Sequence, residues 1–227
     1  MLVYGKNVVE EVIKRNIKIN KVYLQENFKD DIKNYLNHYK IIGLKKYEMD
    51  KKFGGVHQGI VLDIEDYKYA DIDDISFNNS LVLLLDHIED PHNFGAIIRT
   101  AEAAGVNGII IPENRSVEVN STVCKTSVGT VFDMKIVKVT NVVNTINYLK
   151  KKGFWIVGTD MEGTSYDEID YKGSTCIICG NEGKGISRLT KEACDFIATI
   201  PMIGEVNSLN ASVATAIVLF EAVKCRR

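Results

Sequence analysis

The chain has 227 residues, of which 45% are hydrophobic, and this is enough to build a sizeable core in one or two domains. No stretch reaches the ~18 uncharged apolar residues of a membrane-spanning helix. Glu10 and Glu11 stand where an export signal needs an apolar run. The five cysteines, an odd number, suit reduced thiols, so we expect a cytoplasmic protein without a membrane partner.

Charge is spread unevenly along the chain. The formal net charge is −2, which by itself argues against a nucleic-acid partner. Residues 1–52, however, hold 12 Lys and Arg against 7 Asp and Glu, whereas residues 53–227 hold 16 against 23. A basic N-terminal segment can contact phosphates. Taken alone, the charge pattern favours a solvated helix face instead.

The first part of the chain reads as a small α/β unit. Helical spacing predicts a helix over residues 7–15, followed by a short strand over 22–24. Residues 30–39 can form a second helix, and residues 59–62 suggest a closing strand. The acidic, Asn-rich stretch 65–80 then reads as a linker.

From Leu81 onwards the pattern predicts a parallel sheet. Residues 81–85 (LVLLL) form an apolar run typical of a strand buried on both faces. A helix over 94–104 follows and ends at Gly105, a good C-terminal cap. The other expected elements are strands over 108–111, 136–139, 155–158, 175–178 and 196–200, and helices over 141–152 and 209–223. This alternation predicts helices on both faces of the sheet.

Polar residues and glycines gather in three segments that follow strand candidates. These are residues 86–99 (DHIEDPHNFGAIIR), 180–187 (GNEGKGIS) and 200–210 (IPMIGEVNSLN). Ligands of open α/β sheets bind beyond the carboxyl ends of the strands. We therefore expect the three segments to converge on one site.

A metal site is the first alternative. Asp86, His87, Glu89, Asp90 and His92 include metal-ligand types. They fall in a turn before a helix, however, where acidic residues serve as caps. No HExxH or comparable spacing is present. We expect no metal.

Two further patterns resemble known sites without matching them. Cys176 and Cys179 form a C-x-x-C inside a probable strand, where positions three apart point to opposite faces. Buried thiols therefore suit this pair better than structural zinc. Residues 180–187 resemble a phosphate-binding loop in composition, but Lys184 is followed by Gly185 rather than Ser or Thr. A P-loop or dinucleotide site is disfavoured.

What remains is a glycine-rich pocket with hydrogen-bonding groups and an arginine but no catalytic dyad. Its polar candidates are Asn93, Arg99, Glu182, Asn207, Ser208 and Asn210. Such a set suits a reaction whose chemistry lies in a cofactor. Each residue taken singly reads better as a cap or turn former, but three such loops together favour a functional site.

The three segments resemble the SpoU branch of the SPOUT RNA methyltransferases. The matching positions are Asn93, Gly95 and Arg99, then Asn181, Glu182 and Gly183, then Ile200, Pro201, Ser208, Leu209 and Asn210. The resemblance extends over residues 80–227. Residues 1–66, with Tyr4-Gly5 and His57-Gln58-Gly59, look like the RNA-substrate-binding domain of the family. Residues 67–79 remain as the linker. The 23S rRNA guanosine 2'-O-methyltransferase subgroup is the best match to both domains.

The resemblance implies the fold and the site. The fold is a SPOUT-type parallel sheet with a C-terminal trefoil knot, an exception to unknotted chains, preceded by a small α/β RNA-binding domain. S-adenosylmethionine would bind at Gly180, Ile200 and Leu209, mainly through backbone groups. The family is homodimeric, with the active site completed across the interface.

For the chemistry, the resemblance points to Arg99 as the main catalytic residue. Asn93, Glu182, Ser208 and Asn210 would assist it. A guanidinium keeps its proton at neutral pH, so we favour Arg99 as a group that orients the ribose and stabilises developing negative charge. Arg99 as a base assisted by a substrate phosphate stays open.

The expected activity is therefore 2'-O-methylation of a ribose in RNA rather than DNA, within rRNA processing. Two alternatives remain. One is a tRNA ribose methyltransferase of the same family. The other is a non-catalytic RNA-binding or ribosome-assembly factor on the same fold.

Overall fold

The computed structural model describes residues 1–54, 57–181, 183 and 185–227. Its contacts divide the chain into two compact units. The first unit is formed by Met1–Lys68 and Glu118–Phe132, and the second by Tyr69–Val117 and Asp133–Arg227. The chain thus leaves the second unit after Val117, contributes Glu118–Phe132 to the first unit, and re-enters the second unit at Asp133. The expected functional domain boundaries stay a prediction.

The first unit is built on a four-stranded sheet with the strand order β1-β4-β2-β3. Strands β2 and β3 are parallel, whereas β4 runs antiparallel to both β1 and β2. Helix α1 packs through Val8, Val9 and Val12, which share one helical face. The elements of this unit are β1 (Leu2–Tyr4), α1 (Lys6–Lys14), β2 (Ile19–Gln25), α2 (Ile32–Tyr35), β3 (Ile41–Leu44), α3 (Lys46–Phe53), β4 (Ile60–Ile64), α5 (Ser121–Thr126) and the 3-10 turn η2 (Thr130–Phe132).

Helix α2 is shorter than the sequence pattern predicts, with four residues instead of the expected stretch 30–39. Only Ile32 and Leu36 are buried there, so little apolar surface holds further turns in place. Strands β1 and β3 and helix α3 were not expected, because their patterns are short.

The two motifs of the first unit lie next to each other, one at the end of β1 and the other in the turn before β4. The backbone N–H of Lys6, which follows Tyr4-Gly5, donates to Gln58 Oε1 at 3.0 Å. His57 is buried, lies 3.0 Å from Asp50 of α3 through Nε2, and accepts the Gly59 N–H through Nδ1. These residues therefore stabilise the unit itself.

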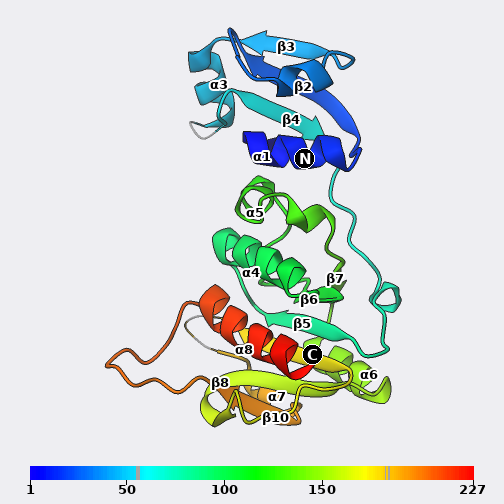
Figure 1. Cartoon of the computed structure of the whole chain (residues 1–227), viewed down its shortest axis with the longest axis vertical. Helices are drawn as coiled ribbons and strands as arrows, with labels where there is room; N and C mark the ends of the chain where they lie inside the picture. Colours follow the sequence, from blue (N-terminus) through cyan, green and yellow to red (C-terminus); the bar gives the residue numbers. More distant parts are fainter. Residues whose placement is uncertain (55–56, 182, 184) are drawn as a thin grey trace. The chain divides into compact units, whose positions relative to one another are not determined.

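The second unit contains a six-stranded sheet with the order β10-β8-β9-β5-β6-β7. Every pair in it is parallel, which confirms the expected α/β class. Figure 1 shows the helices beside this sheet. The elements are η1 (Ile72–Asp74), β5 (Leu81–Asp86), α4 (Pro91–Ala103), β6 (Gly108–Pro112), β7 (Ile136–Val139), α6 (Val142–Lys151), β8 (Trp155–Ser165), β9 (Thr175–Gly180), α7 (Arg188–Glu192), β10 (Phe196–Thr199) and α8 (Ala211–Cys225).

Alternate residues of the sheet face different helices. Leu84 and its β9 neighbour Ile178 belong to a core cluster with Ile146 of α6. Cys179, the next residue of β9, instead contacts Thr215 of α8. Helices α6 and α7 pack together, as do α4 and α8. The two helix pairs thus cover the two faces of the sheet, as the alternation predicted.

Helix α4 starts three residues before the expected position. The Asp90 carboxylate accepts the His92 N–H and caps the helix, and Pro91 occupies the first turn, where no N–H is needed. The chain leaves the helix through Gly105, whose φ of +71° suits glycine.

Among the helices that the structure describes, none is long and apolar enough to cross a membrane. All five cysteines are free. Burial raises the pKa of Cys124 to about 12.

Candidate functional site

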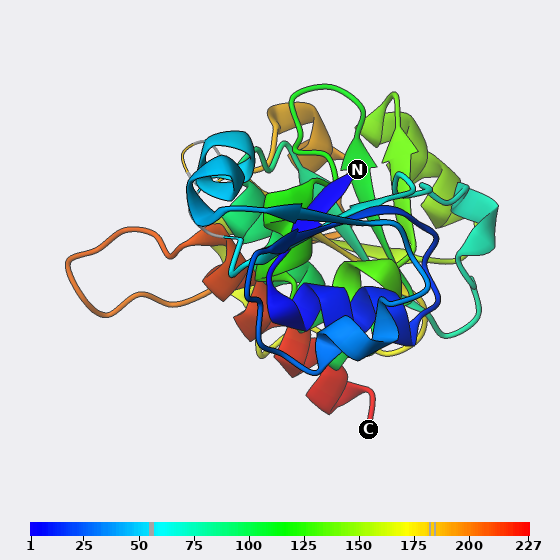
Figure 2. The ribbon, with the colours of Figure 1, turned by 90° about the horizontal axis from the view of Figure 1, so that it is seen from above.

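A cavity of about 600 Å³ opens beyond the carboxyl ends of β9 and β10 and beside the middle of β8. Its walls come from these parts of the strands, from the loops that follow β9 and β10, and from the first turns of α8. Figure 2 shows the second of these loops, residues 200–210, extending away from the start of α8. The described lining residues are Thr159, Asp160, Met161, Cys179, Gly180, Asn181, Gly183, Gly185, Ala198, Thr199, Ile200, Pro201, Met202, Asn207, Ser208, Leu209, Ala211, Ala214 and Thr215.

The three residues expected to bind a cofactor line this one cavity. Gly180 ends β9, Ile200 directly follows β10, and Leu209 lies just before α8. Ser208, expected to act on the substrate, lines it as well. The structure therefore brings two of the three predicted segments together, while the roles of these residues stay a prediction.

Gly180 is required by the fold for a reason that the sequence did not reveal. A Cβ atom there would lie 2.1 Å from the carbonyl carbon of Gly185 and 2.3 Å from the backbone nitrogen of Ile186. The returning loop therefore packs directly on Gly180. A side chain at this position would displace the cavity wall before it met any ligand.

Asn93 and Asn210 connect the third segment to the first. Asn210 Nδ2 donates to Asn93 Oδ1 at 2.9 Å, across 117 positions of sequence. The Oδ1 atom of Asn210 accepts the N–H groups of Ser212 and Val213 and so caps α8. Asn93 is buried in the first turn of α4. The pair therefore ties the starts of α4 and α8 together.

Arg99, the expected main catalytic residue, stands apart from this set. Arg99 is exposed on α4 and is absent from the described cavity lining. Among the described residues, no hydrogen bond or ion pair involves it. Glu182, also expected to take part in catalysis, lies outside the described residues.

The middle of β8 contributes lining residues that sequence analysis missed. Strand β8 was expected to end at residue 158 but runs on to Ser165, which brings Asp160 into the cavity wall. Burial favours a higher pKa for Asp160. The bonds from the Lys191 ammonium, 3.0 Å away, and the Met161 N–H outweigh it and hold the pKa below its usual value. The polar continuation after Gly158 carried no strand signal.

A thiol lies in the same wall. Cys179 is buried between Thr159 and Thr215, whose hydroxyl groups hydrogen-bond to it. Burial raises its pKa to about 11 despite these bonds, so the group is a neutral thiol at physiological pH. Cys176 belongs to the core on the opposite face, which confirms that the C-x-x-C pair is split across the sheet.

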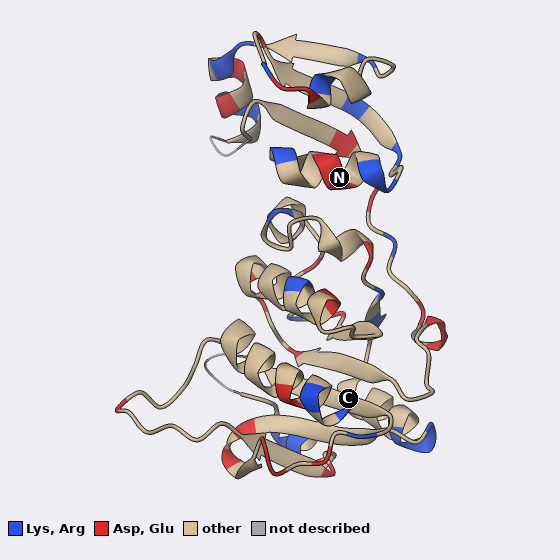
Figure 3. Cartoon of the chain, in the orientation of Figure 1, with Lys and Arg blue, Asp and Glu red and all other residues tan. Residues whose placement is uncertain are grey.

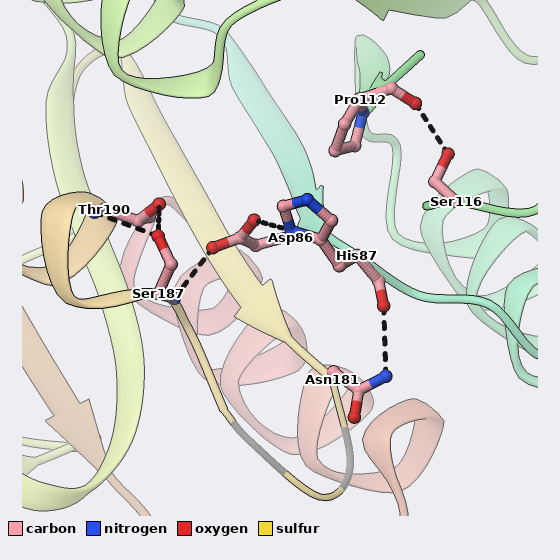
Figure 4. Close-up of polar contacts among 7 residues, drawn as sticks. All are labelled: Asp86, His87, Pro112, Ser116, Asn181, Ser187 and Thr190. Atoms are coloured by element: carbon pink, nitrogen blue, oxygen red, sulfur yellow. Dashed lines mark hydrogen bonds and ion pairs between the residues drawn. The ribbon is translucent and has the colours of Figure 1, made fainter. Parts of the chain in front are cut away.

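Asp86 and His87 lie at the end of β5, outside the described lining (Figure 4). They were weighed as caps or metal ligands, but α4 is capped by Asp90 instead. Asp86 is buried and bonds to His87 and Ser187. Among the described residues, no group of three or more His, Cys, Asp or Glu side chains is arranged to hold a metal.

The geometry defines a class of protein. A concave site of this size beyond the carboxyl ends of a parallel sheet suits a small organic ligand. The strand ends and the two loops supply mostly backbone groups and small side chains. This is an α/β protein with a cofactor-sized cavity and no protein-borne nucleophile–base pair among the described lining residues.

Comparison with known families identifies the class further. The model described as the SpoU rRNA Methylase family matches residues 80–220. The model described as RNA 2'-O ribose methyltransferase substrate binding matches residues 2–70. The chain therefore belongs to the SpoU rRNA methylase family, a family of RNA methyltransferases, which confirms the resemblance found in the sequence.

Individual relatives agree with this assignment. The "Putative TrmH family tRNA/rRNA methyltransferase" of Staphylococcus saprophyticus is 43% identical over 239 residues, which cover 100% of this chain and 96% of the relative. The structure is similar to that of the AdoMet-bound rRNA methyltransferase from Sinorhizobium meliloti, with a TM-score of 0.84 at 26% identity, covering 98% of this chain and 86% of that one. The A. aeolicus TrmH/SpoU tRNA modifying enzyme has a TM-score of 0.60 at 34% identity and covers 66% of this chain and 77% of that one.

Proposed function

We propose that the protein transfers a methyl group from S-adenosylmethionine to a ribose 2'-hydroxyl in RNA, at a guanosine of 23S rRNA. S-adenosylmethionine is the cofactor. The observation that carries the proposal is the single cavity formed by Gly180, Ile200, Ser208 and Leu209 at the sheet edge. These residues come from two of the segments by which the chain resembles the family.

The cavity fits this cofactor in size and charge. Its volume of about 600 Å³ lies within the range of small-molecule sites. Among the described lining residues, Asp160 is the one charged side chain, and no lysine or arginine is present. A phosphate-bearing ligand would find no cationic partner there, whereas a sulfonium cation is compatible with it. Backbone groups at Gly180, Ile200 and Leu209 would hold the cofactor.

The residues of the chain would position the ribose and stabilise its 2'-oxygen as the hydroxyl loses its proton. The cofactor supplies an activated methyl group on a good leaving group, so the protein must orient the 2'-oxygen and stabilise it as its proton leaves. Arg99 would donate hydrogen bonds to the ribose oxygen or to an adjacent phosphate. Its exposure leaves its donors accessible to RNA. Asn93, Ser208 and Asn210 would bind the ribose or shape the loop, and Glu182 would orient Arg99.

The first unit would bind RNA through α3. This helix exposes Lys46, Lys51 and Tyr47, the last with 65% of its side chain accessible. Figure 3 shows basic residues at both ends of α3. Among the described residues no ion pair neutralises these two lysines, whereas Arg15 in the segment after α1 pairs with Glu11. Uncompensated lysines beside an exposed aromatic ring suit phosphates and unstacked bases.

The coverage of the known structures favours rRNA as the substrate. The rRNA methyltransferase of Sinorhizobium meliloti is similar over 98% of the chain, including the first unit, whereas the tRNA modifying enzyme covers 66% of it. A tRNA substrate is the second candidate, because the name of the Staphylococcus relative includes both kinds of RNA.

Two architectural features belong to the same proposal. The first is a C-terminal trefoil knot. It is supported by the path of the chain, which reaches the sheet edge at β10 and returns so that α8 packs on β9 and α4. The second is a homodimer that completes the active site. It is supported by exposed apolar side chains at Ile203, Val213 and Phe220. Light scattering that gave a monomer mass at micromolar concentration would contradict the dimer.

The decisive experiment follows the methyl group. The full chain is incubated with methyl-labelled S-adenosylmethionine and either rRNA or tRNA, and the digested nucleosides are separated by mass spectrometry. We expect 2'-O-methylguanosine from rRNA. Label on a base would refute the reaction, and label on tRNA alone would select the second candidate. Binding of RNA without transfer would indicate a non-catalytic factor.

A further inference from the structure

Two consecutive residues at the end of β5 hold both ends of the glycine-rich loop that follows β9. This loop, residues 181–187, supplies Asn181, Gly183 and Gly185 to the cavity wall. Neither Asp86 nor His87 belongs to the described cavity lining. Any effect that they have on the cavity therefore passes through the loop (Figure 4).

Asp86 holds the far end of the loop. Its side chain is 1% exposed, and a buried carboxylate is costly unless both oxygens have donors. Oδ2 accepts the Ser187 N–H at 2.9 Å, and Oδ1 lies 2.5 Å from His87 Nδ1. Ser187 in turn caps α7 through Thr190. The carboxylate thus fixes the point where the loop ends and α7 begins.

His87 holds the near end through its backbone. Its φ of +64° lies in the left-handed region, which is strained for a residue with a side chain. This conformation is accompanied by an imidazole placed against Asp86 and a carbonyl that accepts Asn181 Nδ2 at 3.1 Å. The bond between the imidazole and Asp86 therefore supports the conformation that presents the carbonyl to Asn181.

The loop closes on itself between these two anchors. The backbones of Asn181 and Gly185 exchange hydrogen bonds of 3.1 and 2.8 Å. Within β9, Gly180 is paired with Asp86, so both anchors lie beside the start of the loop. The loop is thus held at its two ends by two adjacent residues, the buried last residue of β5 and the half-buried residue that follows it.

We propose that Asp86 and His87 are positioning residues that clamp Asn181 and Ser187, the two ends of the loop after β9, where the cavity wall receives the cofactor. This rests on the proposed function, because the cavity must be the S-adenosylmethionine site. The pair acts through Asn181 and Ser187 and touches neither substrate nor cofactor.

The test compares variants that loosen the clamp without adding bulk. His87→Gly removes the imidazole, keeps the carbonyl and relieves the positive φ, so the protein should stay folded. Asn181→Ala removes the bond to that carbonyl. For each variant we expect the Kd for S-adenosylmethionine, measured by calorimetry, to rise about 10-fold, as for other supporting residues of a binding site. For His87→Gly, whose residue lies outside the described lining, the KM for S-adenosylmethionine should rise likewise, while the single-turnover rate at saturating cofactor stays near that of the wild type.

Asp86 offers a conservative rescue. Asp86→Asn can still accept the Ser187 N–H and donate to His87 Nδ1, whereas Asp86→Ala can do neither. Positioning predicts that asparagine keeps most of the affinity and alanine loses it. Equal losses in two folded variants would contradict the clamp.

Ser116→Ala is the matched control. Ser116 Oγ donates to the Pro112 carbonyl at 2.7 Å at the end of the neighbouring strand, and no described bond joins it to the loop (Figure 4). The Ser116→Ala variant should leave the affinity for S-adenosylmethionine unchanged. Unchanged affinity in His87→Gly and Asn181→Ala would overturn the clamp.

Ala214→Phe separates that failure from failure of the cavity assignment, because Ala214 lines the cavity on α8. Phenylalanine there should block the cofactor. If Ala214→Phe blocks cofactor binding while the clamp variants bind normally, the assignment of the cavity as the cofactor site is supported and the clamp is refuted. If Ala214→Phe binds normally, the cavity assignment is wrong and the clamp falls with it.

Discussion

Replacing Asn210 with alanine should destabilise the second unit through two separate losses. The side chain caps α8 through Oδ1 and donates from Nδ2 to the buried Asn93. Losing an N-terminal cap costs about 1 kcal/mol. Removing one hydrogen-bond partner of a buried polar group costs about 1–3 kcal/mol. We therefore expect the free energy of unfolding to fall by about 2–4 kcal/mol.

A second variant separates the two losses. Asn210→Ser keeps a capping oxygen but has no amide to donate to Asn93. Its free energy of unfolding should therefore fall only by the cost of the lost bond to Asn93, about 1–3 kcal/mol. Asn93→Ala completes a double-mutant cycle with Asn210→Ala. The coupling energy between them measures the bond between the two side chains.

Urea unfolding followed by circular dichroism gives each free energy. The reasoning is refuted if Asn210→Ala unfolds within about 0.5 kcal/mol of the wild type, the range of ordinary surface substitutions. If Asn210→Ser has wild-type stability but no methyl transfer, the amide acts on the substrate rather than on Asn93.

Four further outcomes are expected. Gly180→Ala should weaken S-adenosylmethionine binding in calorimetry, because its Cβ would lie 2.1 Å from facing backbone; unchanged affinity would show that the loop yields freely. Arg99→Ala should slow single-turnover methyl transfer on the order of 100-fold while cofactor affinity and melting temperature hold, and Arg99→Lys should rescue little; near wild-type rates would remove this residue from the mechanism. The double variant Lys46→Ala with Lys51→Ala should weaken RNA binding and reduce the slope of log affinity against log salt concentration by about 1 per lysine. Titration at several salt concentrations measures this slope. An unchanged slope would place the RNA elsewhere. Burial raises the pKa of Cys179 to about 11, so only about one thiol in a thousand is ionised at pH 8. Mass spectrometry should therefore find slow alkylation of Cys179 that accelerates as the pH rises towards 11. Rapid modification at pH 8 would contradict its burial.

Point substitutions test the RNA-binding unit better than deletion of the first 78 residues. The segment Glu118–Phe132 belongs to the first unit, and α5 within it buries Val123 and Cys124. Deletion would leave this segment without its packing partners β1 and α1. A loss of RNA binding after deletion would then reflect exposed apolar surface as well as missing contacts.

The sequence by itself determined the class of fold and the segments that form the site. Runs such as 81–85 and 175–178 became central strands of a parallel sheet, because a strand buried on both faces must be apolar at every position. The glycine-rich and polar segments after β9 and β10 appeared in the cavity wall for a similar reason. Turns at strand ends need residues with free backbone conformations and capping side chains.

Only the tertiary structure decided which residues meet. The partners Asn93 and Asn210 are 117 positions apart, and Asp86 and Ser187 are 101 apart. The extension of β8 that carries Asp160 into the cavity was equally invisible, because its pairing with β10 stabilises a polar stretch that has no strand pattern. Local patterns report burial and backbone preference, whereas such contacts depend on strand register and on the path of the loops between strands.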